Sequence, residues 1–186
     1  MIICLLLQLV TKAQIRTINP VSISRPATEI IIPEIIIKPT AFRLTTPETF
    51  DHAISKESNY MGTALVFGVK DFDWSNTIKG NAFVVPEDGV YHFDIQIDFT
   101  YPLTDVYNYE RFYLMLCSAP GTVLEKIDFK IIKTEFTPFY SMSMNTTRAL
   151  TKGFIIYPSF KPIGSNATAP VNITRASFSG FIISKG

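Results

Sequence analysis

The chain has 186 residues, of which 47% are hydrophobic and 13% aromatic, and its 17 basic and 16 acidic residues almost cancel. This composition supports a sizeable apolar core and excludes intrinsic disorder, and without clustered Lys and Arg it disfavours nucleic acid as a partner. Its 12 Pro and 9 Gly separate short apolar runs, which favours an all-β sandwich over a helical domain.

Residues 1–13 are expected to form a secretory signal peptide. Ile2–Val10 is an apolar run too short to span a bilayer, and small residues precede Gln14. Because the leader ends in Ala-Gln, as bacterial leaders do, we expect a secreted, periplasmic or cell-surface bacterial protein with no transmembrane segment in its mature chain. Basic residues before the run are absent, so the start of translation stays open, and the alternative is an N-terminal strand that is never removed. Cys117 then remains as a lone cysteine, which is more typical of a buried apolar residue than of a reactive thiol.

Residues 14–40 are expected to form an extended arm rich in Ile and Pro. Four prolines in this segment exclude a helix or a central strand, yet Ile30–Ile32 and Ile35–Ile37 are too apolar for a solvated linker. We expect the arm to lie along a sheet edge or a neighbouring subunit.

Residues 41–186 are expected to form one domain of eight to ten antiparallel strands. Most of the segments alternate between apolar and polar residues, which predicts half-buried strands. A polar loop is expected over Pro158–Val171. The predicted strands are Ala41–Leu44, Ala64–Val69, Asn81–Val85, Val90–Tyr101, Arg111–Cys117, Leu124–Lys133, Phe139–Asn145, Phe154–Tyr157 and Ala176–Ser184. Two stacked antiparallel sheets, a jelly roll, follow from this pattern.

Two motifs in this domain resemble those of the complement C1q and tumour-necrosis-factor superfamily. The first is an F-x-x-P-x-x-G-x-Y-x-F segment before a central strand, the second is S-F-S-G-F in the last strand, and Leu150–Gly153 resembles part of an L-x-x-G-D element in which Phe154 replaces the acidic residue. The motif positions that the resemblance marks as structural are Phe83, Pro86, Gly89, Tyr91, Phe93, Gly153, Phe178, Gly180 and Phe181. The resemblance implies a C1q-like jelly roll that assembles as a homotrimer and presents loops to a partner. The aromatic run in Arg111–Leu116 points the same way, because it offers more apolar surface than one sandwich interior can hold.

The polar face of the predicted central strand is a candidate ligand-binding surface. His92, Asp94, Gln96 and Asp98 alternate there and lie about 7 Å apart, so they could hold sugar hydroxyls or calcium. The competing interpretation is a solvated face or a subunit contact whose hydrogen bonds are satisfied.

A second candidate site is the segment between Lys70 and Asn76. Asp71, Asp73 and Asn76 could supply oxygen ligands to calcium, although the spacing lacks the glycine and glutamate of a calcium loop. Trp74, the only Trp, could stack on a sugar ring. The competing interpretation is a tight turn in which Trp74 anchors the core.

The sequence indicates a protein that is not an enzyme and needs no cofactor, with calcium as the one candidate ion. Its two histidines, His52 and His92, form no H-x-H or H-E-x-x-H motif, and G-x-S-x-G and Gly-rich phosphate loops are missing from the sequence. Three functional hypotheses remain. The first is a secreted, noncatalytic, trimeric recognition module that binds a protein or glycan. The second is a structural subunit of the cell envelope or of an extracellular appendage, and the third is a carbohydrate-active enzyme with two carboxylates about 5–10 Å apart.

Overall fold

The computed structural model describes residues 39–55, 60–101, 110–130, 139–164 and 170–186. The expected signal peptide and residues 14–38 of the arm lie outside these residues. The described residues contain no helix, and so none that could cross a membrane. They form twelve strands: β1 (Ala41–Thr45), β2 (His52–Ile54), β3 (Thr63–Ala64), β4 (Val69–Asp73), β5 (Ile78–Lys79), β6 (Ala82–Val84), β7 (Gly89–Thr100), β8 (Arg111–Ala119), β9 (Thr122–Lys130), β10 (Phe139–Leu150), β11 (Ile155–Ile163) and β12 (Val171–Lys185).

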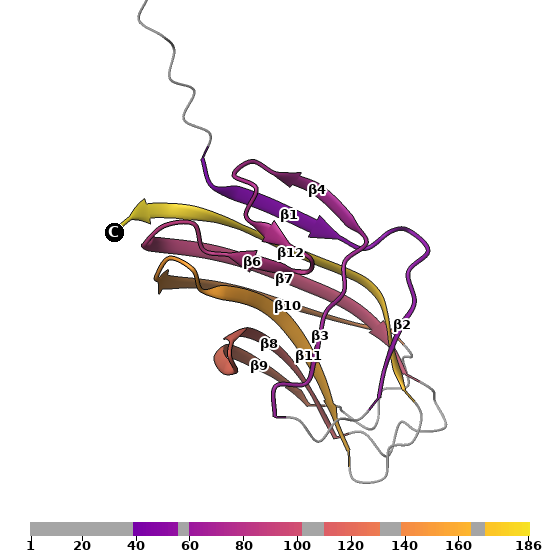
Figure 1. Ribbon diagram of the computed structural model, residues 1–186. Coiled ribbons are helices and arrows are strands. Elements are labelled where there is room, and N and C mark those ends of the chain that lie inside the picture. The colour runs from indigo at the N-terminus through magenta and orange to yellow at the C-terminus, as the bar shows by residue number, and fades with distance from the viewer. Residues whose placement is uncertain (1–38, 56–59, 102–109, 131–138, 165–169) are drawn as a thin grey trace, which may run out of the picture. The chain divides into compact units, whose positions relative to one another are not determined.

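The strands form two six-stranded antiparallel sheets that pack face to face (Figure 1). The first sheet has the order β10-β7-β12-β1-β4, with β2 beside β12, and the second has the order β5-β6-β11-β8-β9, with β3 beside β11. The expected all-β, two-sheet fold is therefore confirmed.

Strand β7 lies inside the first sheet and pairs along its length with β10 on one side and β12 on the other. Its odd-numbered residues from Tyr91 to Phe99 are at most 2% exposed, whereas the even-numbered residues face outward. This is the alternation that the sequence predicts, and it divides the strand into a core face and a surface face.

Aromatic side chains join the two sheets. Phe42 of β1 stacks on Phe83 of β6 with ring centroids 4.8 Å apart, and Phe99 of β7 meets Phe112 of β8 edge-on at 4.7 Å. All four side chains are at most 1% exposed. Such pairs contribute about 0.5–1.5 kcal/mol each beyond the apolar area that they bury, so they fix how the sheets pack.

The motif glycines lie where backbone approaches closely. A Cβ built on Gly180 would lie 2.8 Å from the rings of Phe42 and Phe93 and 2.9 Å from the carbonyl oxygen of His92, and one on Gly89 would lie 2.6 Å from the carbonyl oxygen of Ser184. Gly180 therefore occupies a site of close approach, as a glycine inside a strand predicts.

The other motif residues lie at the turn that leads into β7 and in β12. The Tyr91 hydroxyl donates to the Glu87 carbonyl oxygen at 2.7 Å, which ties the buried ring to the Pro86–Gly89 turn. Gly153, with a φ of 87°, donates from its amide to Val85 at 2.8 Å. Phe178 is buried in the core, but Phe181 is 46% exposed and lies on the outer face, so its place in the motif is not that of a core residue.

Several predicted boundaries are wrong. Strand β10 continues to Leu150 instead of ending at Asn145, and β12 begins at Val171 instead of Ala176. The predicted strand Ala64–Val69 is the end of β3, an irregular segment and the first residue of β4. Since β3 belongs to the second sheet and β4 to the first, the chain crosses between the sheets here instead of forming one strand.

The predicted loop Pro158–Val171 is also wrong at its beginning, because β11 continues to Ile163. The Pro158 carbonyl oxygen accepts from the Leu65 amide at 2.9 Å, away from β8. The backbone nitrogen and carbonyl oxygen of a strand residue point to the same side of the strand, so the Pro158 nitrogen also faces away from β8. Pro162 lies four residues later and faces the same way. Neither proline therefore interrupts the hydrogen bonds between β11 and β8.

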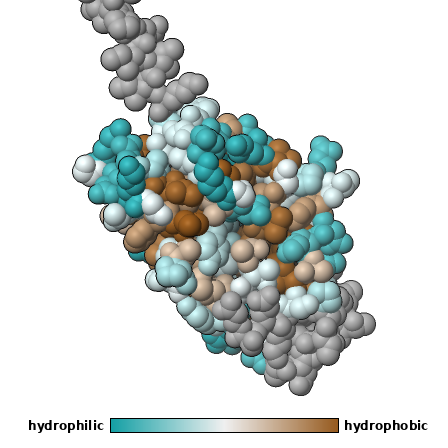
Figure 2. All heavy atoms as spheres, viewed as in Figure 1, coloured by the Kyte–Doolittle hydropathy of each residue, from teal (hydrophilic) through white to brown (hydrophobic). Residues whose placement is uncertain are grey.

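Part of the surplus apolar surface expected on β8 is covered within the chain. Phe112, Leu114 and Leu116 face the core, while Met115 and Cys117, on the other face, are buried in a second cluster with Met61. Other hydrophobic residues remain exposed. Figure 2 shows hydrophobic residues in several places on the visible face, with hydrophilic residues between them.

Candidate functional site

The outer face of the first sheet carries a ladder of polar pairs between β7 and β10. Asn145 donates to the Asp94 carboxylate at 2.6 Å, and Ser141 donates to the Asp98 carboxylate at the same distance. The predicted polar face therefore exists, and within it His92, Asp94 and Asp98 already have hydrogen-bond partners. This is the arrangement that the competing interpretation, a face with satisfied hydrogen bonds, describes.

His92 contacts both the Asp94 carboxylate on its own strand and the Thr147 hydroxyl on β10. Its Nε2 lies 3.2 Å from Oδ1 of Asp94, and its Nδ1 lies 3.1 Å from the Thr147 hydroxyl. Donation from Nε2 to the carboxylate leaves Nδ1 of a neutral ring to accept from Thr147. The His92 side chain is 25% exposed and that of Asp94 is 44% exposed, so both remain within reach of a ligand.

The aromatic residue beside His92 is Phe181, not Trp74. The rings of His92 and Phe181 are 5.2 Å apart. Trp74 lies beyond β4, three strands away from β7, which is about 14 Å at the usual strand spacing. It is 52% exposed and stacks on Phe72 at 5.1 Å, so it does not anchor the core.

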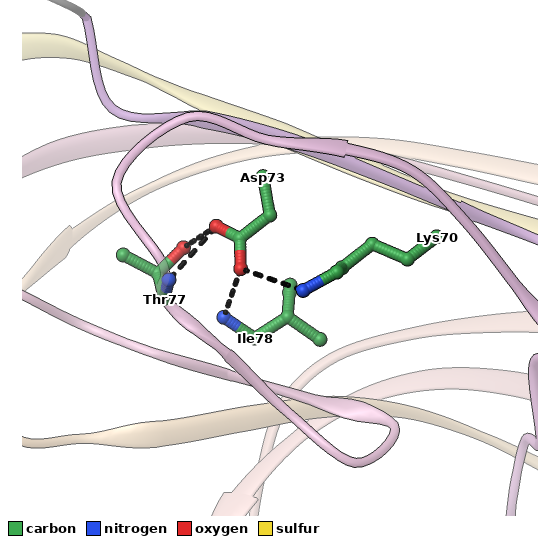
Figure 3. A network of polar contacts seen from close by, with 4 residues as sticks. All are labelled: Lys70, Asp73, Thr77 and Ile78. Atoms are coloured by element: carbon green, nitrogen blue, oxygen red, sulfur yellow. Dashed lines mark hydrogen bonds and ion pairs between the residues drawn. The ribbon is translucent and has the colours of Figure 1, made fainter.

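Asp73 organises the turn between β4 and β5 (Figure 3). Its carboxylate accepts from the amide and hydroxyl of Thr77 at 2.8 and 2.9 Å and from the Ile78 amide at 3.0 Å, with Lys70 at 3.7 Å. Burial acts to raise the pKa of Asp73, but the hydrogen bonds from Ile78 and Thr77 outweigh it and lower the pKa. The side chain is 1% exposed, so it serves as the internal support of the turn.

The other two oxygen-bearing residues of this segment also have structural roles. Asp71 accepts from the Thr45 hydroxyl at 3.1 Å and pairs with Arg43 at 3.4 Å. Asn76 has a φ of 52°, a conformation that Asn tolerates in tight turns. Among the described residues, no group of three or more His, Cys, Asp or Glu side chains is placed to hold a metal ion. A calcium ion would have to replace the partners of Asp71 and Asp73, and its binding here stays a prediction.

An open concavity of about 470 Å³ lies on the outer face of the first sheet, at the end of β1. We call it the arginine concavity, and its lining residues are Arg43, Thr45, Thr46, Pro47, Glu48, Gln96, Thr174, Arg175 and Ser177. The register shift between Ile173 and Arg175 allows the adjacent residues Thr174 and Arg175 to line the same hollow.

Of these lining residues, the sequence pattern predicts only Gln96, as part of the polar face. Ser177 pairs with both Thr45 and Gln96, so three strands that are far apart in sequence meet at this point. A single sequence holds no signal for such a meeting, because neither arginine lies in a motif and the register shift in β12 has no marker.

By sequence, the chain matches no family model and no curated protein. By structure, it is similar to the globular domain of the zebrafish complement 1qA protein, with a TM-score of 0.52 and 21% sequence identity over 80% of this chain and 100% of that one. At this identity the likeness speaks for the fold. The described domain therefore has the C1q-like two-sheet sandwich that its motifs imply.

Proposed function

We propose that the protein is a secreted, noncatalytic recognition module that assembles as a homotrimer and binds a protein or glycan. The observation that carries this proposal is the C1q-like fold, similar to a globular domain of complement. Recognition modules of this kind keep a rigid sandwich and present polar surfaces and loops to a partner. The outer face of the first sheet, with its exposed His92 and Asp94, provides such a surface.

The arrangement of the carboxylates supports a noncatalytic role. Asp94 and Asp98 lie on one face of one strand, four residues apart, which is about 13 Å along the strand. Glycosidases hold their two carboxylates about 5–10 Å apart across a cleft. Each of these two carboxylates also accepts a short hydrogen bond from β10, so neither is poised as a free acid or base.

Two measurements test the proposal. Light scattering at micromolar concentration should give three times the chain mass, and a glycan array probed with the labelled trimer should show selective binding. A monomer mass would contradict the trimer, and a trimer that binds neither glycans nor proteins of its own surroundings would contradict recognition.

The alternative, a structural subunit of the cell envelope or an appendage, depends on the arm. A truncated chain that begins at Thr40 decides between them. If the arm packs on the module, truncation should lower the melting temperature or increase the binding of a hydrophobic dye. Unchanged melting temperature, mass and dye binding would favour an arm that is free before assembly, and with it the envelope role.

A further inference from the structure

We propose that the arginine concavity binds an acidic saccharide, by contacts of Arg43 and Arg175 with its carboxylate or sulfate groups. This inference deepens the proposed recognition function and rests on it.

The charge of the arginine concavity is available to a ligand. Arg175 is exposed and forms no ion pair with any residue that the structure describes. Arg43 pairs with Asp71 through Nε at 3.4 Å, and its side chain is 52% exposed, so its terminal nitrogens can reach an anion. A planar guanidinium matches carboxylate and sulfate oxygens with two parallel hydrogen bonds, which makes this contact strong and directional.

The remaining polar groups suit a ligand rich in hydroxyls. The Thr46 hydroxyl accepts from the Ala176 amide at 3.0 Å and keeps its own proton to donate. The Thr45 and Thr174 hydroxyls donate to Asp71 and to the Asp98 carbonyl oxygen, so they keep lone pairs that can accept. Together with the Gln96 amide and the Ser177 hydroxyl, they offer both donors and acceptors along the hollow.

The lining also indicates what kind of saccharide fits. None of the described lining residues is aromatic, so ring stacking contributes little and charge dominates selection. Glu48 adds one carboxylate, which can accept hydrogen bonds from sugar hydroxyls.

The register indicates an extended ligand. Arg43 is paired with Ser179, and Arg175 lies four residues earlier on β12, so the two Cα positions are about 13 Å apart along the sheet. An oligosaccharide with acidic groups on different sugar units can present one such group to each guanidinium. The volume of about 470 Å³ is within the usual range of small-ligand sites.

Calorimetric titration of the full-length secreted protein tests the inference with three tetrasaccharides at low salt. The first is heparin-derived and sulfated, the second is from hyaluronan and carries only carboxylates, and the third is uncharged chitotetraose. We expect an acidic tetrasaccharide to bind, and to bind more weakly as salt increases. Binding of the heparin fragment alone assigns the anion as sulfate, binding of the hyaluronan fragment alone assigns it as carboxylate, and binding of both supports the shared chemistry.

The variants Arg175→Gln and Arg43→Gln should each weaken this binding by about tenfold or more, as expected for loss of a charged hydrogen-bond donor. Arg111→Gln is the matched control, because Arg111 is a similarly exposed arginine on the second sheet and should leave the affinity unchanged. Equal binding of chitotetraose, no binding of any probe, or affinity unaffected in both concavity variants would overturn the inference. A trimer that still binds neutral glycans or a protein in that case would leave the proposed function standing, whereas a monomer that recognises nothing would remove both.

Discussion

Replacement of Gly180 by Ala should destabilise the protein although it adds a single methyl group. The added Cβ would lie 2.8 Å from the rings of Phe42 and Phe93 and 2.9 Å from the His92 carbonyl oxygen, closer than carbon atoms approach without displacement. All of these atoms belong to the buried centre of the first sheet, where rings cannot simply turn away. Overpacking of a dense core costs about 1–3 kcal/mol. The Ala gains back about 0.5–1 kcal/mol, because Gly is disfavoured in strands.

The difference between these two ranges is about 0–2.5 kcal/mol, and its centre, about 1 kcal/mol, corresponds to a melting temperature lower by about 2–4 °C for a domain of this size. Circular dichroism at fixed protein concentration measures it, since the melting temperature of an oligomer depends on concentration. Ser179→Ala is the control, because Ser179 is the neighbouring residue in β12 and faces outward. A Gly180→Ala protein that melts at or above the wild-type temperature would show that the rings of Phe42 and Phe93 can move, and would refute the argument from close approach.

Three further outcomes follow from the site. Asp73→Asn should cost about 1–3 kcal/mol of stability, because it weakens a buried acceptor of three hydrogen bonds. Because the pKa of Asp73 is lowered in the folded protein, its ionised carboxylate stabilises the fold fully at pH values above the ordinary carboxyl pKa. This stabilisation is lost as the pH falls through the lowered pKa. The free energy of unfolding of the Asp73→Asn variant, measured in urea, should therefore depend less on pH below about pH 4 than that of the wild type. If calcium binds the turn, it should raise the wild-type melting temperature and leave the Asp71→Asn, Asp73→Asn double variant unmoved, whereas an unmoved wild type would contradict the site. Burial raises the pKa of the Cys117 thiol, so iodoacetamide should modify it only after unfolding, and modification of the native protein would show that the cluster around Met61 opens.

The sequence predicts the elements whose pattern is set within one strand. Period-two alternation locates β7 and its core face within one residue at each end, because that strand is half-buried and paired on both sides. The close approach at Gly180 is also predicted, since a glycine inside a strand often marks a place where a neighbouring strand or ligand comes close.

What depends on the direction of a side chain, or on which strand lies beside a residue, could not be predicted. Asp73 and Trp74 are adjacent in sequence, yet one side chain is buried and the other is half exposed, because Asp73 turns inward to hold the amides of Thr77 and Ile78. A sequence with acidic residues beside an aromatic residue fits a cation site, and it fits equally well a turn held by its own carboxylate. Only the direction in which the carboxylate points distinguishes the two. The same holds for Pro158. Whether this proline interrupts a strand depends on which neighbouring strand its nitrogen faces, and the sequence does not show that.

The exposed aromatic surface that favours a trimer lies on the first sheet and not on β8. The chain itself covers Met115 and Cys117, but Phe181, Ile183 and Trp74 are 46%, 54% and 52% exposed near the end of the first sheet opposite to the arginine concavity.

These three residues are related by the strand pairing. Phe181 pairs with Ala41, whose carbonyl oxygen accepts from the Trp74 amide, so the apolar residues extend across neighbouring strands. We therefore propose that the apolar end of this face serves assembly and that the arginine concavity at its other end serves ligand binding.

The double variant Trp74→Ser, Phe181→Ser should therefore shift the mass measured by light scattering from trimer towards monomer, and it should leave the unfolding of the separated chain almost unchanged. Phe154→Ser is the matched control, because Phe154 is 45% exposed but precedes β11 of the second sheet, and its variant should remain trimeric. If the double variant is as trimeric as the wild type while the control dissociates, the trimer is formed by the second sheet instead, and the apolar end of the first sheet is left for a different protein partner.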